Sequence, residues 1–181
     1  SAIAELVDRL NAATAPGRYA FLDVDARTGT VDALGTDAIK VGLIYQPARL
    51  TPVGTTAVLA TPAFVTGGDG QIRNRPSLAQ AFEDRNGGVF IADVNHFKSK
   101  GRACDLPAAG DGQGNCNAVR VRAAQELAAW LATDPTGTGD DDVLILGDLT
   151  AYRLEDPLDA LREAGYTDLP APAFGAHAST F

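Results

Sequence analysis

The sequence predicts a mixed β-sheet covered by helices, which is an α/β sandwich. Three apolar segments suited to buried strands lie at residues 38–47, 87–97 and 142–148. Amphipathic helices follow some of the expected strands, and short turn-rich connections follow others. Because hairpins join antiparallel strands whereas helices usually join parallel ones, this mixture favours a mixed sheet over a purely parallel one.

The N-terminal half begins with a helix and continues as short strands. Residues 1–13 carry one apolar stripe at helical spacing, formed by Ile3, Leu6, Val7 and Leu10. Turn-rich connections then separate a series of expected strands, at residues 19–24, 38–47, 49–54 and 56–60. A polar loop at residues 66–76 precedes residues 77–84, which predict an edge strand.

The C-terminal half predicts two further strands and two helices. The second long apolar strand leads into a Gly-rich loop and then into a helix at residues 117–134. One stripe of this helix is apolar, formed by Val119, Ala123, Leu127, Trp130 and Leu131. The third apolar strand precedes a helix at residues 155–166. Asp156 can cap this helix, Pro157 fits its first turn, and Gly165 ends it.

The composition limits the classes of partner. The chain has 181 residues, enough for one domain with a substantial core, and a formal net charge of −8. An acidic chain does not attract phosphate backbones as a whole, so a nucleic-acid partner needs a local basic site or a metal ion. No apolar run approaches the roughly 18 residues that span a membrane, and no signal peptide or obligate protein partner is evident. The lack of methionine indicates a mature secreted protein or an excised fragment.

The two cysteines, Cys104 and Cys116, lie in a polar, Gly-rich loop. As a disulfide they would close a small loop and contribute about 2–3 kcal/mol in the loop-entropy model. A disulfide also implies an oxidising compartment, so an extracellular or periplasmic location is expected. Two free thiols are the alternative. A zinc site is not expected, because two cysteines without a nearby histidine do not provide four ligands.

Polar residues suited to phosphate chemistry stand where two apolar strands end. His96 ends one strand and is followed by Lys98 and Lys100, and Asp148 ends another. A strand-end carboxylate can bind a metal ion or polarise a water molecule. Nearby lysines disfavour a protonated imidazole, unless an anion such as phosphate offsets them. The alternatives are a solvated histidine in a basic loop and an ordinary turn aspartate.

Two arginines form a third candidate. Arg73 and Arg75 flank Asn74 just before Pro76. Planar guanidinium groups fit phosphate oxygens, although a solvated pair in a loop would have the same sequence. Together, the histidine, the carboxylate, an asparagine and the cations suit a phosphate ester, whose hydrolysis needs a polarised water, stabilised phosphoryl oxygens and help for the leaving group.

Several segments together carry a resemblance to a known family. They are NHFKSKG, GQGNCNAVRVRAAQELAAWL, GDLTAYRLEDPLDALREAGYTDL, DAIKVGLIYQPARLTPVG and NRPSLAQAF. The chain resembles the endonuclease/exonuclease/phosphatase superfamily, and within it the bacterial extracellular nucleases related to deoxyribonuclease I. The resemblance implies a four-layer α/β sandwich with two mixed β-sheets between helices, here incomplete at both ends. Residues 1–181 are accordingly expected to be one domain, the central fragment of a nuclease domain.

The resemblance also implies metal-dependent hydrolysis of phosphodiester bonds in nucleic acid, DNA rather than RNA, with Mg²⁺, Mn²⁺ or Ca²⁺. His96 matches the family histidine that acts at the phosphate. Asp148 matches the aspartate that orients or deprotonates the attacking water, and it is a candidate metal ligand. Arg75 matches the arginine before proline that contacts a backbone phosphate. Other residues of the His96 motif are expected to help hold the substrate, namely Asn95, Lys98 and Lys100. Tyr152 and Glu155 are expected to be structural.

The chain departs from the family pattern at three places. Thr150 occupies a catalytic position where the family has asparagine, whose amide both donates and accepts hydrogen bonds. A threonine hydroxyl is shorter and cannot span the same gap. The family's metal-binding glutamate has no counterpart in the chain. His177 follows Ala176 rather than aspartate, so it is not assigned to the family's closing Asp-His pair. The chain therefore lacks part of the active site, and little activity is expected of it alone.

Two other functions remain open. A phosphatase or phosphodiesterase acting on a smaller ester is one, because the superfamily includes such enzymes and the acidic charge does not favour long polyanions. A non-catalytic relative is the other, because Thr150 replaces the family asparagine.

Overall fold

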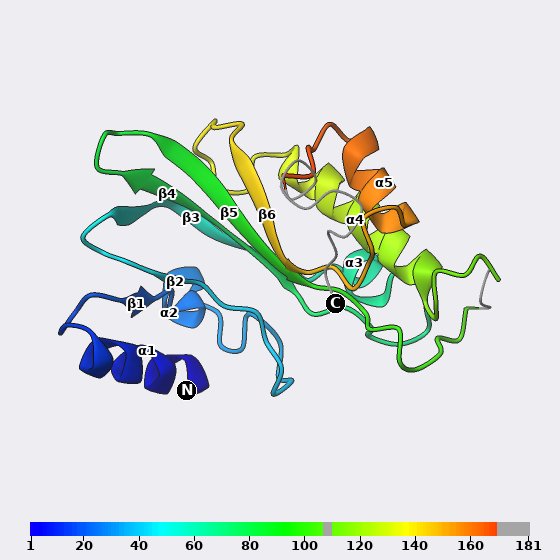
Figure 1. Cartoon of the computed structure of the whole chain (residues 1–181), viewed down its shortest axis with the longest axis horizontal. Coiled ribbons are helices and arrows are strands. Elements are labelled where there is room, and N and C mark those ends of the chain that lie inside the picture. The colour runs from blue at the N-terminus through cyan, green and yellow to red at the C-terminus, as the bar shows by residue number, and fades with distance from the viewer. Residues whose placement is uncertain (107–109, 170–181) are drawn as a thin grey trace.

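A four-stranded mixed sheet with the strand order β3–β4–β5–β6 forms the centre of the fold. Its strands are β3 Leu50–Leu59, β4 Ser77–Asp84, β5 Val89–His96 and β6 Val143–Asp148. The pairs β3–β4 and β4–β5 are antiparallel, whereas β5 and β6 are parallel. The computed structural model, which describes residues 1–106 and 110–169, thus confirms the predicted mixed sheet (Figure 1).

A second sheet and the helices lie on either side of this centre. The second sheet is antiparallel and pairs β1 (Ala20–Phe21) with β2 (Ile44–Tyr45). This sheet, α1 and α2 lie on one side of the four-stranded sheet, and α3, α4 and α5 lie on the other (Figure 1). The helices are α1 Ala2–Ala13, α2 Val24–Thr28, α3 Pro62–Thr66, α4 Asn117–Leu131 and α5 Asp156–Glu163. The expected class, an α/β sandwich with two sheets and outer helices, is confirmed.

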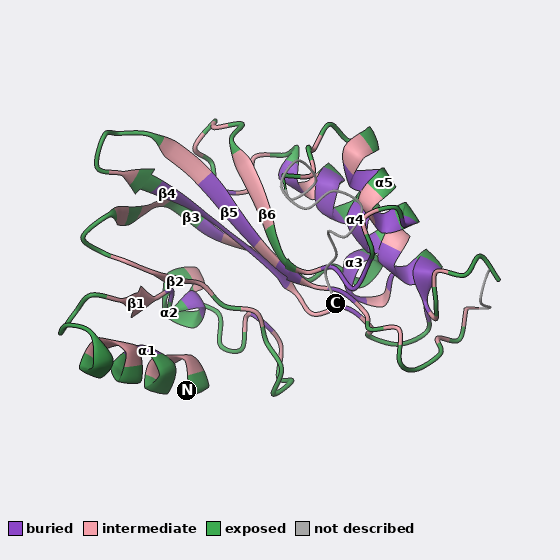
Figure 2. Cartoon of the chain, in the orientation of Figure 1, coloured by how far each residue is buried: buried purple, intermediate pink, exposed green. Residues whose placement is uncertain are grey.

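Apolar clusters cover both faces of the four-stranded sheet. Because strand side chains alternate, Ile91 of β5 packs toward α4 and α5, whereas Val94 packs toward Leu22 and Val24 on the opposite face. The predicted stripe of α4 is confirmed, with Trp130 only partly buried. Figure 2 shows buried residues concentrated in β4, β5 and α4, whereas β6 is more exposed. No helix within the described ranges combines the length and the apolar character needed to cross a bilayer.

Three predictions for the N-terminal half were wrong. The strand expected at residues 19–24 is only β1, because Asp23 accepts a hydrogen bond from the backbone of Ala26 and starts helix α2. The strand expected at residues 38–47 is only β2. The strands expected at 49–54 and 56–60 form a single strand, β3, with a change of register between Val53 and Ala57.

Three further details also differ from the sequence predictions. The strand at residues 77–84 is central rather than at an edge, and its first six residues are buried. Leu6 of α1 is 50% exposed, so it is not part of the buried stripe. The N-cap position of helix α5 is Glu155, whose side chain makes no capping hydrogen bond, and Asp156 lies in the first turn.

Asp93 is a buried carboxylic acid in the middle of β5. Ser77 Oγ donates to its Oδ1 at 2.6 Å, and Asn95 Nδ2 donates to its Oδ2 at 2.5 Å. Burial raises the pKa of Asp93 to about 6, although these two hydrogen bonds act to lower it. A carboxyl group whose pKa is raised by folding stabilises the fold fully below its ordinary pKa. This contribution is lost as the pH rises through about 6.

We therefore predict that Asp93→Asn raises the free energy of unfolding at pH 8. The variant should also lose less of this free energy than the parent does as the pH rises from 4 to 6. The gain is at most about 3 kcal/mol, from 1.36 kcal/mol per pKa unit. Asn95 can accept from the new amide by turning over, because its Oδ1 has no hydrogen-bond partner. Urea unfolding at several pH values measures the effect, with the exposed Asp8→Asn as control. If the free energies of unfolding of Asp93→Asn and the parent change with pH in the same way, the prediction is contradicted.

Candidate active site

The parallel pairing of β5 with β6 places His96 directly opposite Asp148. Neighbouring strands lie about 4.8 Å apart, so the two residues are held side by side at the carboxyl ends of their strands. Directly opposed residues project from the same face of a sheet. Both side chains are partly exposed. The structure thus brings together the two residues that the sequence predicts as the catalytic pair.

Gly147 lets the two strand ends approach each other. Its φ angle of +108° is one that side chains rarely permit. A Cβ atom at this position would lie 2.1 Å from the carbonyl oxygen of Asn95, which belongs to the backbone and cannot turn away. Glycine is therefore required for the register that sets His96 opposite Asp148.

Thr150 holds the carboxylate of Asp148 in place. Its backbone N–H donates to Asp148 Oδ1 at 2.8 Å. Its hydroxyl lies 3.3 Å from both that oxygen and the carbonyl oxygen of Phe97, and it can donate to one of them at a time. The side chain is buried, and its φ angle of +47° is unusual for a β-branched residue. Through these contacts Thr150 orients the carboxylate of Asp148.

The loop before β4 reaches the same end of the sheet, because β4 runs antiparallel to β5. The backbone N–H of Arg75 donates to the carbonyl oxygen of His96 at 3.1 Å. Asn74 is fully buried and accepts from the backbone N–H of Lys98 at 2.9 Å, while its amide donates to Phe64. Sequence reasoning noted Asn74 only as the residue between two arginines and missed this anchoring role.

Positive charge accumulates around Lys98. Burial lowers the pKa of this lysine, and so do four nearby guanidinium groups, those of Arg73, Arg120, Arg102 and Arg75. The lysine ammonium donates to the backbone carbonyls of Ser99 at 2.6 Å and Arg102 at 3.2 Å. A basic site thus exists locally in an acidic chain, as a nucleic-acid partner would require.

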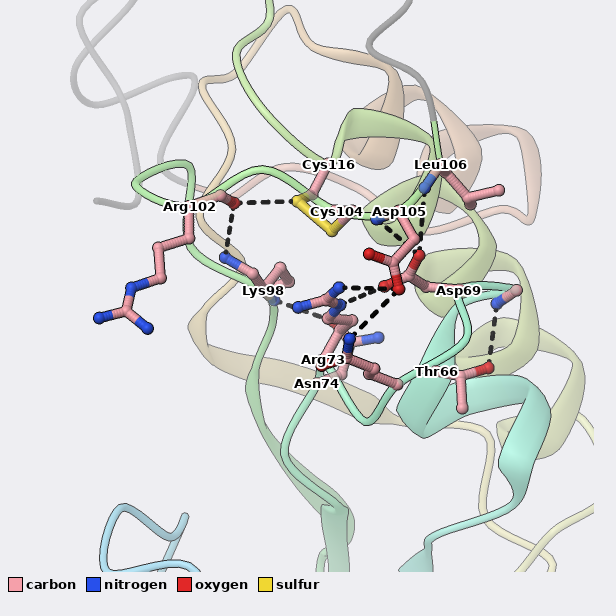
Figure 3. Close-up of polar contacts among 12 residues, drawn as sticks. Thr66, Asp69, Arg73, Asn74, Lys98, Arg102, Cys104, Asp105, Leu106 and Cys116 are labelled. Carbon is pink, nitrogen blue, oxygen red and sulfur yellow. Dashed lines mark hydrogen bonds and ion pairs between the residues drawn. A yellow bond between two sulfur atoms is a disulfide. The ribbon is translucent and has the colours of Figure 1, made fainter.

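Carboxylates pair with two of these arginines. Arg75 lies 3.2 Å from Asp37 Oδ2, and its Nε is buried without a hydrogen-bond partner. Arg73 pairs with the buried Asp69, as Figure 3 shows. Burial would raise the pKa of Asp69, but the hydrogen bond and charge of Arg73, with backbone N–H groups of the facing loop, bring the net pKa below its ordinary value.

Arg120 is a buried cation of α4 that the sequence analysis missed. Its guanidinium donates to the carbonyl oxygens of Lys98 at 3.2 Å and Asn115 at 2.6 Å, and also to that of Gln113. Burial lowers its pKa, while Glu155 and Asp111 act in the opposite direction. Its helical spacing from Ala123, Ala124 and Leu127 is the signal that could have revealed it.

Two expected substrate contacts are not brought into this site. Asn95 is buried on the α4 side of the sheet, because neighbours in a strand face opposite ways and His96 faces the other side. Lys100 is ion-paired with Glu155 at 2.7 Å and lies over the ring of Tyr152, 4.1 Å from its centroid. Glu155 also accepts from the backbone N–H of Tyr152, which agrees with the structural roles expected for this pair.

The predicted disulfide is present between Cys104 and Cys116, with a Cα–Cα distance of 5.4 Å. It ties the loop after β5 to the start of α4. Asp69 adds a second tie to this loop, since its Oδ1 accepts from the backbone N–H groups of Asp105 and Leu106 at 2.9 and 3.1 Å (Figure 3).

Residues that could hold a metal ion are few. Across residues 1–106 and 110–169, no three or more His, Cys, Asp or Glu side chains group closely enough to bind a metal. Asp148 is the carboxylate at the strand ends, and Mg²⁺ commonly uses one or two carboxylates with water and substrate phosphates. The described residues therefore fit only part of a metal site. His177 lies outside the described residues.

The comparisons with known proteins identify the fold. No protein-family model matches the chain, and no curated protein matches it in sequence. Solved structures do match. An endonuclease/exonuclease/phosphatase family protein from Bacteroides thetaiotaomicron superposes with a TM-score of 0.58 and 16% identity, over 90% of this chain and 50% of that one. The fold is that of the endonuclease/exonuclease/phosphatase proteins.

A second structure of this fold gives the same result. The human Nocturnin catalytic domain, solved with a bound sulfate anion, superposes with a TM-score of 0.56 and 14% identity, over 98% of this chain and 58% of that domain. The chain thus spans 50% and 58% of the length of these two structures.

We predict that Gly147→Ala destabilises the fold far more than Gly165→Ala. Both glycines have similar φ angles, +108° and +99°, so both alanines carry backbone strain of about 1–3 kcal/mol. Only at Gly147 would the added methyl group collide with a strand, whereas Gly165 has open space around it. Thermal unfolding of the two variants measures the difference. Equal losses would show that β6 does not depend on this close approach.

Proposed function

We propose that this chain belongs to a metal-dependent nuclease that hydrolyses phosphodiester bonds in nucleic acid, with DNA as the preferred substrate. The observation that carries the proposal is the His96–Asp148 pair at the parallel strand ends, beside a local concentration of cations. Nocturnin, which shares the fold, was solved with a sulfate anion, and this agrees with an anionic ligand. Residues 1–181 are proposed to be the central part of one such domain.

The geometry supports distinct roles for the two residues. The imidazole of His96 has no hydrogen-bond partner in the part of the chain that the structure describes, so its nitrogens are available to a phosphate oxygen or a leaving group. Thr150 occupies Oδ1 of Asp148, which leaves Oδ2 to accept a proton from an attacking water. Arg75 and Lys98 are proposed phosphate contacts.

A divalent ion, Mg²⁺, Mn²⁺ or Ca²⁺, is the proposed cofactor. Such an ion would neutralise charge on the phosphoryl oxygens. Asp148 is its proposed ligand, and further ligands would have to come from outside the described residues. An extracellular or periplasmic location is proposed on the basis of the Cys104–Cys116 disulfide, which persists in oxidising compartments.

A non-catalytic relative is the second candidate. The observation that favours it is the buried position of Thr150, whose hydroxyl turns toward Asp148 and Phe97 and away from solvent. A relative of this kind would bind nucleic acid through the basic loop without cutting it.

The complete protein is expected to nick plasmid DNA when Mg²⁺ or Mn²⁺ is present and to stop when EDTA is added. Plasmid and a nucleotide ester are incubated in parallel, and products are followed by gel and by phosphate release. Cleavage of the nucleotide ester alone would favour a small-ester phosphatase. If neither substrate is cleaved, with or without EDTA, both hydrolytic functions are ruled out and the non-catalytic relative is favoured.

We also predict that Thr150→Asn raises the cleavage rate of the complete protein by roughly tenfold, the effect of about 1.4 kcal/mol in the transition state. Asparagine tolerates the left-handed backbone better than threonine, and its longer amide can both donate and accept. Thr150→Ser, which keeps the hydroxyl and removes the β-branch, is the matched control and should stay near the parent rate. A rate for Thr150→Asn that is unchanged or lower contradicts the prediction.

A further inference from the structure

We propose that Lys98 and Arg102, two and six residues beyond His96, form an anion subsite that takes a second phosphate group of the strand whose scissile phosphate lies at the His96–Asp148 pair. This inference rests on the proposed function and names residues that would bind its polynucleotide substrate away from the cleaved bond. An ester with a single phosphate has no second phosphate to place there, so the subsite would favour a chain of linked nucleotides over such an ester.

Neutral groups alone hold the ammonium of Lys98. Its Nζ donates to the carbonyl oxygens of Ser99 and Arg102, and it lies 3.3 Å from the hydroxyl of Ser99. Within residues 1–106 and 110–169, no carboxylate pairs with it. These contacts fix the position of the ammonium but leave its charge unneutralised, which suits a site for an anion.

Arg102 extends from the same loop into solvent. Its side chain is exposed, and its guanidinium has no ion-pair partner among the described residues. Figure 3 shows it directed away from the Asp69–Arg73 pair. An exposed guanidinium without an ion-pair partner can contact phosphate oxygens through two parallel hydrogen bonds.

The loop that carries both cations is anchored along its length. The backbone of Lys98 is bound to Asn74, and the Cys104–Cys116 disulfide fixes the loop two residues beyond Arg102. The segment then binds Asp69 through its backbone. A preorganised loop loses little conformational freedom when a ligand binds, so weak surface cations can contribute measurably to affinity.

A third cation lies beneath the loop. Arg120 donates to the carbonyl oxygen of Lys98 and forms no ion pair with any carboxylate that the structure describes. Arg73 and Arg75 differ, because carboxylates pair with both. The loop therefore gathers three cations without ion-pair partners, Lys98, Arg102 and Arg120, in a chain whose formal net charge is −8.

The spacing along the chain limits how far the second phosphate lies from the first. Arg102 follows His96 by six residues, a segment that spans at most about 22 Å when fully extended. Phosphates recur about every 3.4 Å along the axis of one DNA strand. If a strand runs along this loop with its scissile phosphate at His96, the phosphate that reaches Arg102 is therefore at most about six nucleotides away from the scissile one.

Binding of a fluorescein-labelled single strand of about 20 nucleotides to the complete protein tests the subsite directly. EDTA prevents cleavage, and fluorescence anisotropy gives Kd at several salt concentrations. Arg102→Gln should raise Kd about five- to tenfold at low salt and reduce the slope of log K against log salt by about 0.7. Arg102→Lys should raise Kd less than Arg102→Gln does, because it keeps the charge but loses the two parallel hydrogen bonds. Arg49→Gln removes an equal charge at an exposed site elsewhere and should change Kd less than about twofold.

A second measurement separates this inference from the proposed function. Bis(p-nitrophenyl) phosphate is a diester with a single phosphate, so Arg102→Gln should leave its KM and kcat unchanged while raising KM for the oligonucleotide. Equal Kd changes in Arg102→Gln and Arg49→Gln, or a loss on the small diester, would overturn the subsite. If the parent protein cleaves neither substrate, the proposed function fails, and the anisotropy comparison still decides whether Arg102 binds a phosphate.

Discussion

The parallel pairing of β5 with β6 is the constraint on which the rest of the structure depends. Parallel strands need a long crossover, and here α4 supplies it while covering one face of the sheet. The crossover leaves from the carboxyl end of β5, so the loop rich in cations begins beside His96. The same pairing sets Asp148 opposite His96 and depends on the missing side chain of Gly147. One register therefore fixes the candidate catalytic pair and the basic loop together.

The local distribution of charge in this chain differs from its net charge. The net charge is strongly negative, yet several arginines gather around Lys98 after the end of β5, and burial together with the charges of these arginines lowers the pKa of Lys98. Some of these cations are neutralised by Asp37 and Asp69 and act as structural ties. Lys98, in contrast, is held by neutral carbonyl groups and has no carboxylate partner among the described residues. This division separates groups that build the site from groups that remain available to an anion.

The sequence predicted the features that depend on local patterns. Apolar runs predicted β5 and β6, a helical stripe predicted α4, and spacing in a polar loop predicted the disulfide. Features that depend on long-range packing were harder to predict. The central position of β4 follows from pairing on both sides, and the cap at Asp23 overrode the apolar run that predicted a longer strand. The opposite facing of Asn95 and His96, by contrast, follows from strand alternation and could have been read from the sequence. The resemblance predicted His96 and Asp148 as a pair, but only the folded structure shows that the backbone N–H of Thr150 donates a hydrogen bond to Asp148.

A double-mutant cycle on His96 and Asp148 in the complete protein is the most direct test of the central claim, that the strand register makes these two residues act as one unit. Each alanine variant should lose about 10²–10⁴ in the rate of plasmid cleavage, the range for a positioned acid or base. If the residues act together, the double variant should be little slower than the slower single variant, since groups that work as a unit are not additive. Losses that multiply in the double variant would show that the two residues act independently and would contradict the account.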